Sequence, residues 1–150
     1  LGMFAITTTG VRHQSLGETE QLRQRSIYLP IARGAIPPAL AIFDFPNPDL
    51  VTGKRAVTTV PVQALFMMNS PFVREMANAV GLQFTKSELS LEEIIQELYQ
   101  RILIRDADAN DVSMGYKYVT RLMSSGKSQR ESIGLFVQIL FSSTEFRFIQ

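Results

Sequence analysis

Arginine side chains recur through the proline-rich part of the sequence, and Asp44 lies among them. A planar guanidinium can bind a carboxylate or phosphate through two parallel hydrogen bonds, so these residues could line a pocket for an anionic ligand. The alternative is structural. Asp44 would pair with one or more arginines and hold this segment against the helices, since loop backbone groups need such partners. We favour the structural role. The candidate polar cluster comprises Arg25, Arg33, Asp44, Arg55, Gln63 and Asn69.

Gln63 and Asn69 follow the arginines and lie six residues apart, so on a helix they do not share one face. We expect each amide to hydrogen-bond backbone of the proline-rich segment rather than a ligand. Thr58 and Thr59 are interpreted as residues that start a helix, because no base is identified that would make either a nucleophile.

Asp106, Asp108 and Asn110 alternate as the first ligands of a calcium-binding loop do. The rest of that motif is missing: its sixth position is Asp111 instead of glycine, and its twelfth is Lys117 instead of glutamate. Acidic side chains at the start of a helix bind free N–H groups and interact favourably with the helix dipole. We therefore interpret the acidic run as a helix N-terminus and expect no metal site.

The remaining titratable residues do not form a recognisable catalytic arrangement. His13 is the only histidine, and no serine–histidine–aspartate set can be assembled around it. Glu92, Glu93 and Glu97 are best explained as the solvated face of an amphipathic helix. We expect no catalytic residue and no cofactor in this chain, which favours a domain that is not an enzyme by itself.

The composition limits the class of protein further. A chain of 150 residues is the size of one domain, and a net charge of +1 argues against a dedicated nucleic-acid-binding protein. The absence of cysteine excludes disulfides, zinc–thiolate sites and covalent haem attachment within the chain. The longest apolar run, 133–141, has about half the length of a membrane span. The chain starts at Leu1 and not at methionine, so we interpret it as a piece of a longer protein. No signal-peptide pattern is visible at its start.

All seven prolines lie between Pro30 and Pro71, and they divide the chain into parts of different character. Residues 1–24 are polar and aperiodic and are expected to form an irregular arm. Residues 25–59 carry prolines together with apolar side chains, which favours an extended segment wrapped on a core, with a short helical turn near Pro38. Residues 60–150 are predicted to be helical, so that 25–150 form a single domain.

Helix-start signals are frequent in this second part. The first predicted helix has Pro61 in its first turn, and the next has Ser70 as its cap and Gly81 as its stop. Ser-x-x-Glu capping boxes at 90–93 and 128–131 begin two further helices, and an aspartate pair at 108–111 begins another. The 108–111 helix is predicted to end at 124–126 and to bury Val112, Tyr116, Val119 and Met123. Together with an apolar tail, these helices predict an all-α, bundle-like domain of about five helices with the proline-rich segment wrapped on it.

Several motifs occur in a fixed order along the chain: 25–30 (RSIYLP), 43–46 (FDFP), 53–55 (GKR), 58–65 (TTVPVQAL), 68–73 (MNSPFV) and 140–148 (LFSSTEFRF). They resemble the C-terminal domain of unknown function in large exported proteins of planctomycetes and related bacteria. The resemblance implies a periplasmic or cell-surface location and upstream domains that often include a cytochrome c-like domain. It supplies no catalytic residues. Where the family usually has an Arg-x-Pro turn, this chain has 105–110 (RDADAN), so a different local turn is expected.

Three functions follow from the motifs and the resemblance. The first is an accessory structural or interaction domain at the C-terminus of a larger exported bacterial protein, with other domains of that protein or a surface protein as partners. The second is part of an enzyme or of an anionic-ligand site, of polysaccharide type, shared with an upstream domain. The third is a surface that receives the cytochrome-like domain during electron transfer. We expect neither nucleic acid nor a membrane-spanning segment.

Overall fold

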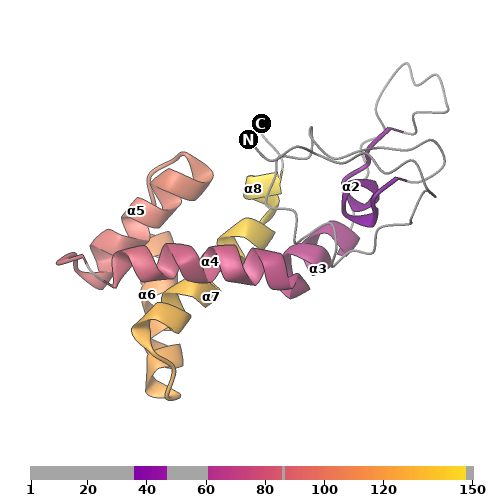
Figure 1. Ribbon diagram of the computed structural model, residues 1–150. Coiled ribbons are helices and arrows are strands. Elements are labelled where there is room, and N and C mark those ends of the chain that lie inside the picture. Colours follow the sequence, from indigo (N-terminus) through magenta and orange to yellow (C-terminus); the bar gives the residue numbers. More distant parts are fainter. Residues whose placement is uncertain (1–35, 47–60, 86, 148–150) are drawn as a thin grey trace, which may run out of the picture. The chain divides into compact units, whose positions relative to one another are not determined.

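The computed structural model describes residues 36–46, 61–85 and 87–147 (Figure 1). These residues are 77% helical and contain no strand, which confirms the predicted all-α fold. The helices in this part of the chain are α2 (Pro38–Ile42), α3 (Pro61–Asn69), α4 (Pro71–Phe84), α5 (Leu91–Leu103), α6 (Ala109–Ser124), α7 (Gln129–Ser142) and α8 (Thr144–Arg147).

The chain divides into two units, Leu1–Thr59 and Val60–Gln150, and each is described by itself. In the first unit, α2 begins with proline and confirms the predicted helical turn. The predicted arm at 1–24 and most of the predicted wrapped segment lie outside the described residues. The arm, the wrapping and the boundaries of the single domain therefore stay predictions.

Local side-chain caps begin most helices of the second unit, as the sequence predicts. α4 starts at Pro71, and the Ser70 hydroxyl accepts a hydrogen bond from the Val73 N–H at 3.3 Å. In α5, α6 and α7 the cap side chain and the side chain three residues later each accept a hydrogen bond from the other's backbone N–H. The reciprocal pairs are Ser90 with Glu93, Asp108 with Asp111, and Ser128 with Glu131. Thr58 and Thr59, the predicted caps of α3, lie outside the described residues.

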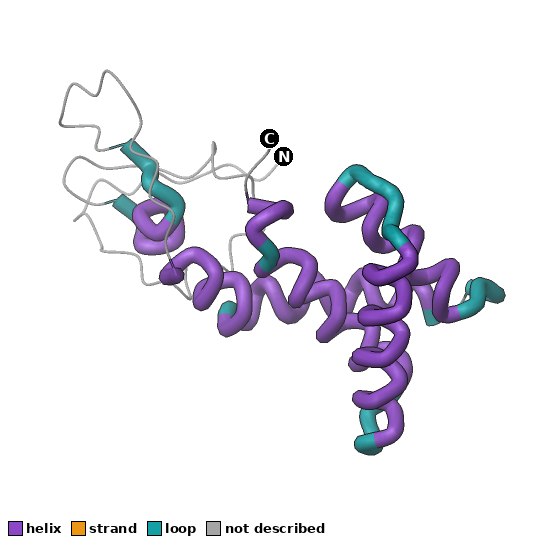
Figure 2. Tube along the Cα trace, turned by 180° about the vertical axis from the view of Figure 1, so that it is seen from behind, coloured by secondary structure: helices purple, strands orange, loops and turns teal. Residues whose placement is uncertain are grey.

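α7 is the central helix of the second unit, because α3, α4, α5, α6 and α8 all pack against it (Figure 2). Its most extensive contact is with α4. Ile133 and Val137 on α7 have no exposed surface, and α5 adds Ile95, which is equally buried. Burial of such side chains is the main stabilising contribution to a helical core. The core residues are Ala77, Phe84, Ile94, Ile95, Leu98, Tyr99, Val119, Ile133, Phe136, Val137 and Leu140.

Gly81 does not end α4, contrary to the sequence prediction, and the helix continues to Phe84. A Cβ atom at Gly81 would lie 2.6 Å from the carbonyl oxygen of Arg130 on α7. Gly134 faces the same crossing, where a Cβ atom would lie 2.4 Å from the Asn78 side-chain oxygen. Glycine therefore allows the backbones of α4 and α7 to approach closely and serves here as a packing residue.

The buried face of α6 matches the predicted one in part, because Val119 is buried and Val112 packs against the core. Tyr116 and Met123 are 41% and 42% exposed, and the buried positions are Gly115 and Val119. A Cβ atom at Gly115 would lie 2.9 Å from the Phe136 ring. The Phe136 ring packs against this glycine, so the buried stripe of α6 runs through Gly115 and Val119 and leaves Tyr116 and Met123 exposed.

Among the helices of the described segments, none has the length and apolar character needed to cross a bilayer.

Candidate functional site

The structure describes three of the six residues of the candidate polar cluster, namely Asp44, Gln63 and Asn69. Arg25, Arg33 and Arg55 lie outside the described residues, so the predicted pairing of Asp44 with arginine stays a prediction.

Asp44 has a backbone role at the end of α2. Its φ is 55°, in the left-handed region that aspartate adopts more readily than most residues. Its N–H donates to the Ala41 carbonyl at 3.2 Å, and the Phe45 N–H donates to the Leu40 carbonyl at 3.1 Å. This pair of bonds is the Schellman arrangement, which satisfies the last carbonyls of a helix, and Pro46 then prevents its continuation. The FDFP motif is thus explained as a helix end.

Gln63 and Asn69 lie on different sides of α3, as their spacing predicts. Gln63 is buried at 6% exposure, whereas Asn69 is exposed and donates from its side-chain nitrogen to the Leu65 carbonyl at 2.8 Å. The structure therefore does not bring these two amides together into a site. Their predicted bonds to the proline-rich segment lie outside the described residues.

Gln138 holds the C-terminal end of α3 to the central helix. Its side chain is 7% exposed, and its amide nitrogen donates to the Met68 carbonyl at 2.7 Å and to the Met67 carbonyl at 3.3 Å. The last carbonyls of a helix have no partner within the helix, so this amide satisfies two of them. This role is not predicted from the sequence, although the single amide inside the apolar run 133–141 is a usable signal.

The opposite side of α3 presents apolar side chains that the second unit leaves exposed. Val62, Leu65 and Met68 are 51%, 55% and 57% exposed, and their spacing of three residues places them along one side of the helix. We call these three residues the outer face of α3. The helix carries no charged side chain at all. An uncharged helix with a row of apolar side chains on one side is normally covered there, so the outer face of α3 is the clearest candidate contact surface in the described residues.

A second polar group joins α5, α6 and α8, and we call it the Arg105 cluster. Arg105 donates to Asp111 at 2.7 Å and to both carboxylate oxygens of Glu145, and its guanidinium lies 5.0 Å from the centre of the Tyr99 ring. The Tyr99 hydroxyl donates to the other Asp111 oxygen at 3.2 Å. Arg105 also donates to the carbonyl of Asp106 at 2.9 Å.

These contacts shift the ionisation of the group. Burial, together with the negative charge of Asp111, raises the pKa of Tyr99 to about 12. Burial opposes ionisation of Asp111, but the hydrogen bonds from Arg105 and from the Asp108 N–H outweigh it and lower its pKa.

The residue before Arg105, Ile104, has a φ of 56° and is 89% exposed. Because Arg105 already binds the carboxylates of Asp111 and Glu145, the cluster acts as a tie between helices. The cluster is not predicted from the sequence, because Arg105 and Glu145 are 40 residues apart.

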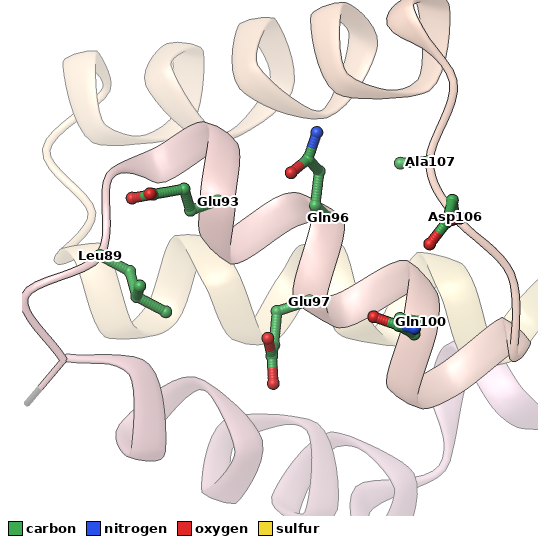
Figure 3. A pocket seen from close by; sticks show the side chains of 7 residues that line it. All are labelled: Leu89, Glu93, Gln96, Glu97, Gln100, Asp106 and Ala107. Carbon is green, nitrogen blue, oxygen red and sulfur yellow. The ribbon is translucent and has the colours of Figure 1, made fainter.

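A shallow depression of about 360 Å³ runs along α5 and the loop before α6 (Figure 3). Its walls carry Glu93, Gln96, Glu97, Gln100 and Asp106. The three carboxylates point in different directions (Figure 3). Glu93 accepts the Ser90 N–H at 2.7 Å, and Glu97 pairs with Arg101 at 2.6 Å. The arrangement thus matches a solvated helix face and does not match a pair of cooperating acids.

The acidic run before α6 acts as a helix start. Asp108 accepts the Asp111 N–H at 2.7 Å, and Asp111 accepts the Asp108 N–H at 3.2 Å. Within the described segments, histidine and acidic side chains do not gather in threes as a metal site would require.

The protein is thus an all-α domain in which Gln138 and the Arg105 cluster connect helices and the outer face of α3 is apolar and exposed. Residues 6–119, more than half of the chain, match the model of a family described as "Protein of unknown function (DUF1553)". The chain belongs to that family. No curated protein and no solved structure matches the sequence.

Proposed function

We propose that this chain is an accessory interaction domain of a larger exported bacterial protein. It binds another domain of the same polypeptide through the outer face of α3. The proposal extends to a C-terminal position in that protein and to the periplasm or cell surface, where the motif resemblance supports it. Family membership is compatible with this role, because the family has no assigned activity.

The observation that carries the proposal is the exposure of three apolar side chains on an uncharged helix. Water contact with such side chains is unfavourable by roughly 25 cal/mol for each Å² of apolar surface. The other side of α3 is already held by Gln138, so docking on the outer face would not disturb the fold.

The small area of the outer face of α3 favours a partner domain on the same polypeptide chain. Stable complexes between separate proteins bury about 1,200–2,000 Å², far more than three side chains of one short helix provide. A domain on the same chain has an effective concentration in the mM range, at which a small apolar contact is sufficient. The small area of the outer face of α3 therefore favours another domain of the parent protein over a free partner.

The test uses the parent protein with one charged substitution on the outer face of α3. Met68→Lys should release the domain and increase the rate at which protease cleaves the connection to the preceding domain. Met114→Lys on α6 is the matched control, because Met114 is 60% exposed against 57% for Met68. The control should leave the cleavage rate at the wild-type value. Equal cleavage rates for wild type and both variants would contradict the proposal.

A further inference from the structure

The end of the α6–α7 hairpin, residues 117–130, carries only positive charges. Between Asp111 and Glu131 the sequence contains no acidic residue, and it contains the four cations Lys117, Arg121, Lys127 and Arg130. All four side chains are exposed, as is every residue from 123 to 131. Both views show the end of α6 and the following loop projecting beyond α4 and α5 (Figures 1 and 2). We call residues 117–130 the basic hairpin.

The charges of the basic hairpin have no ion-pair partner within the described residues. The ion pairs found there with arginine belong to Arg101 and Arg105. Arg121 lies in the last turn of α6, where the helix dipole favours a cation. Lys127 and Arg130 lie at the start of α7, where the dipole disfavours one. The fold itself therefore does not explain these two cations.

Glu131 is the nearest acidic residue in the sequence, and it is already occupied. Its carboxylate accepts hydrogen bonds from the Ser128 hydroxyl at 2.8 Å and from the Ser128 N–H at 3.1 Å. These bonds, with the charges of Lys127 and Arg130, hold its pKa below the usual value. It remains ionised at neutral pH and offsets only part of the hairpin's positive charge.

The acidic residues of this unit gather elsewhere. Residues 87–111, which include α5 and the start of α6, carry seven acidic and two basic side chains. The far end of α6 carries the basic hairpin, so positive and negative charge are separated along this helix. Such a separation orients a protein toward a charged surface.

We propose that the basic hairpin docks on the anionic headgroup surface of a lipid bilayer. A projecting end meets a flat surface without the groove that a linear polymer would need, and the acidic region then faces away from the lipid. Each lysine or arginine near an anionic bilayer strengthens binding about fivefold, so four cations supply several hundredfold. Isolated ion pairs with another protein would add only up to a few-fold each. Tyr116 and Met123, each about two-fifths exposed, add side chains suited to the headgroup boundary.

The experiment measures co-sedimentation of the 150-residue chain with vesicles. One vesicle preparation contains about 30% phosphatidylglycerol in phosphatidylcholine, and the other contains phosphatidylcholine alone; charge-driven binding requires the anionic lipid. The chain should sediment with the first and not with the second, and 0.5 M salt should release it because salt screens surface charge. The double variant Arg121→Gln, Lys127→Gln should bind about thirtyfold more weakly.

The matched control is the double variant Arg74→Gln, Arg101→Gln, which removes the same charge from α4 and α5. It should bind like wild type, and circular dichroism should show that both variants are folded. Three results would overturn the proposal: absence of binding to anionic vesicles, equal binding to both lipid preparations, or equal loss in the two double variants. Soluble dextran sulfate that bound the chain as tightly as the vesicles, with the same loss in the hairpin variant, would also overturn it in favour of a polyanion site.

Discussion

Replacement of Gly81 by alanine tests whether close backbone approach between α4 and α7 holds the second unit together. Intrinsic preference alone predicts stabilisation, because alanine in a helix interior is about 1 kcal/mol better than glycine. The structure predicts the opposite. The new Cβ would lie 2.6 Å from the Arg130 carbonyl oxygen and 3.1 Å from the Gly134 nitrogen. Both are backbone atoms of the central helix, so neither can rotate away.

The expected magnitude follows from these two effects. Overpacking of a core costs about 1–3 kcal/mol, and a backbone obstacle places this site at the upper end, about 3 kcal/mol. Subtracting the helix-propensity gain of about 1 kcal/mol leaves a net destabilisation of about 2 kcal/mol. For a chain of this size that corresponds to a fall in Tm of about 4–8 °C.

Urea unfolding followed by circular dichroism at 222 nm measures the effect, with an unchanged m-value as the sign of an unaltered unfolding transition. Ala79→Gly is the control, because Ala79 is exposed on the same helix and reports propensity alone. It should destabilise by about 1 kcal/mol. If Gly81→Ala stabilised the protein by a similar amount, close packing of α4 against α7 would be refuted.

Three further predictions follow from the polar groups and the backbone. Gln138→Leu should destabilise by about 2–3 kcal/mol, because two carbonyls of α3 lose their donor; an unchanged urea midpoint would contradict the role given to this amide. Ile104→Gly should stabilise by about 1 kcal/mol in the same assay, because glycine adopts a φ of 56° without strain and the isoleucine is exposed. Tyr99 has a pKa of about 12 against an ordinary 10.0, so the folded state favours the protonated phenol. The contribution of Tyr99 to the free energy of unfolding is complete below pH 10 and is lost as pH rises through about 12. Tyr99→Phe should remove this fall in the unfolding free energy at alkaline pH.

The helix starts could be predicted from the sequence because caps are local. Ser90 and Glu93 lie within one turn of each other, and their hydrogen bonds need no other part of the chain. Pro71 after Ser70 is an equally local signal.

Features that depend on contacts between distant residues could not be predicted in this way. Gly81 has the local pattern of a helix stop, and only the approach of α7 explains why a glycine lies inside the helix at this position. Arg105 and Glu145 are separated by 40 residues, so their pairing depends on the packing of α8. Gln138 and Met68 are separated by 70 residues and meet only after α3 has packed on α7. Of the candidate polar cluster, spacing correctly predicted that Gln63 and Asn69 would not share a face.

The central claim, that the outer face of α3 contacts another domain of the parent protein, is tested most directly by methionine oxidation. Met68 and Met114 are almost equally exposed, at 57% and 60%, so dilute peroxide should oxidise them at similar rates in this chain alone. In the whole parent protein, mass spectrometry should show Met68 protected severalfold while Met114 reacts as before. Equal oxidation rates for Met68 in the isolated chain and in the parent protein would contradict the claim.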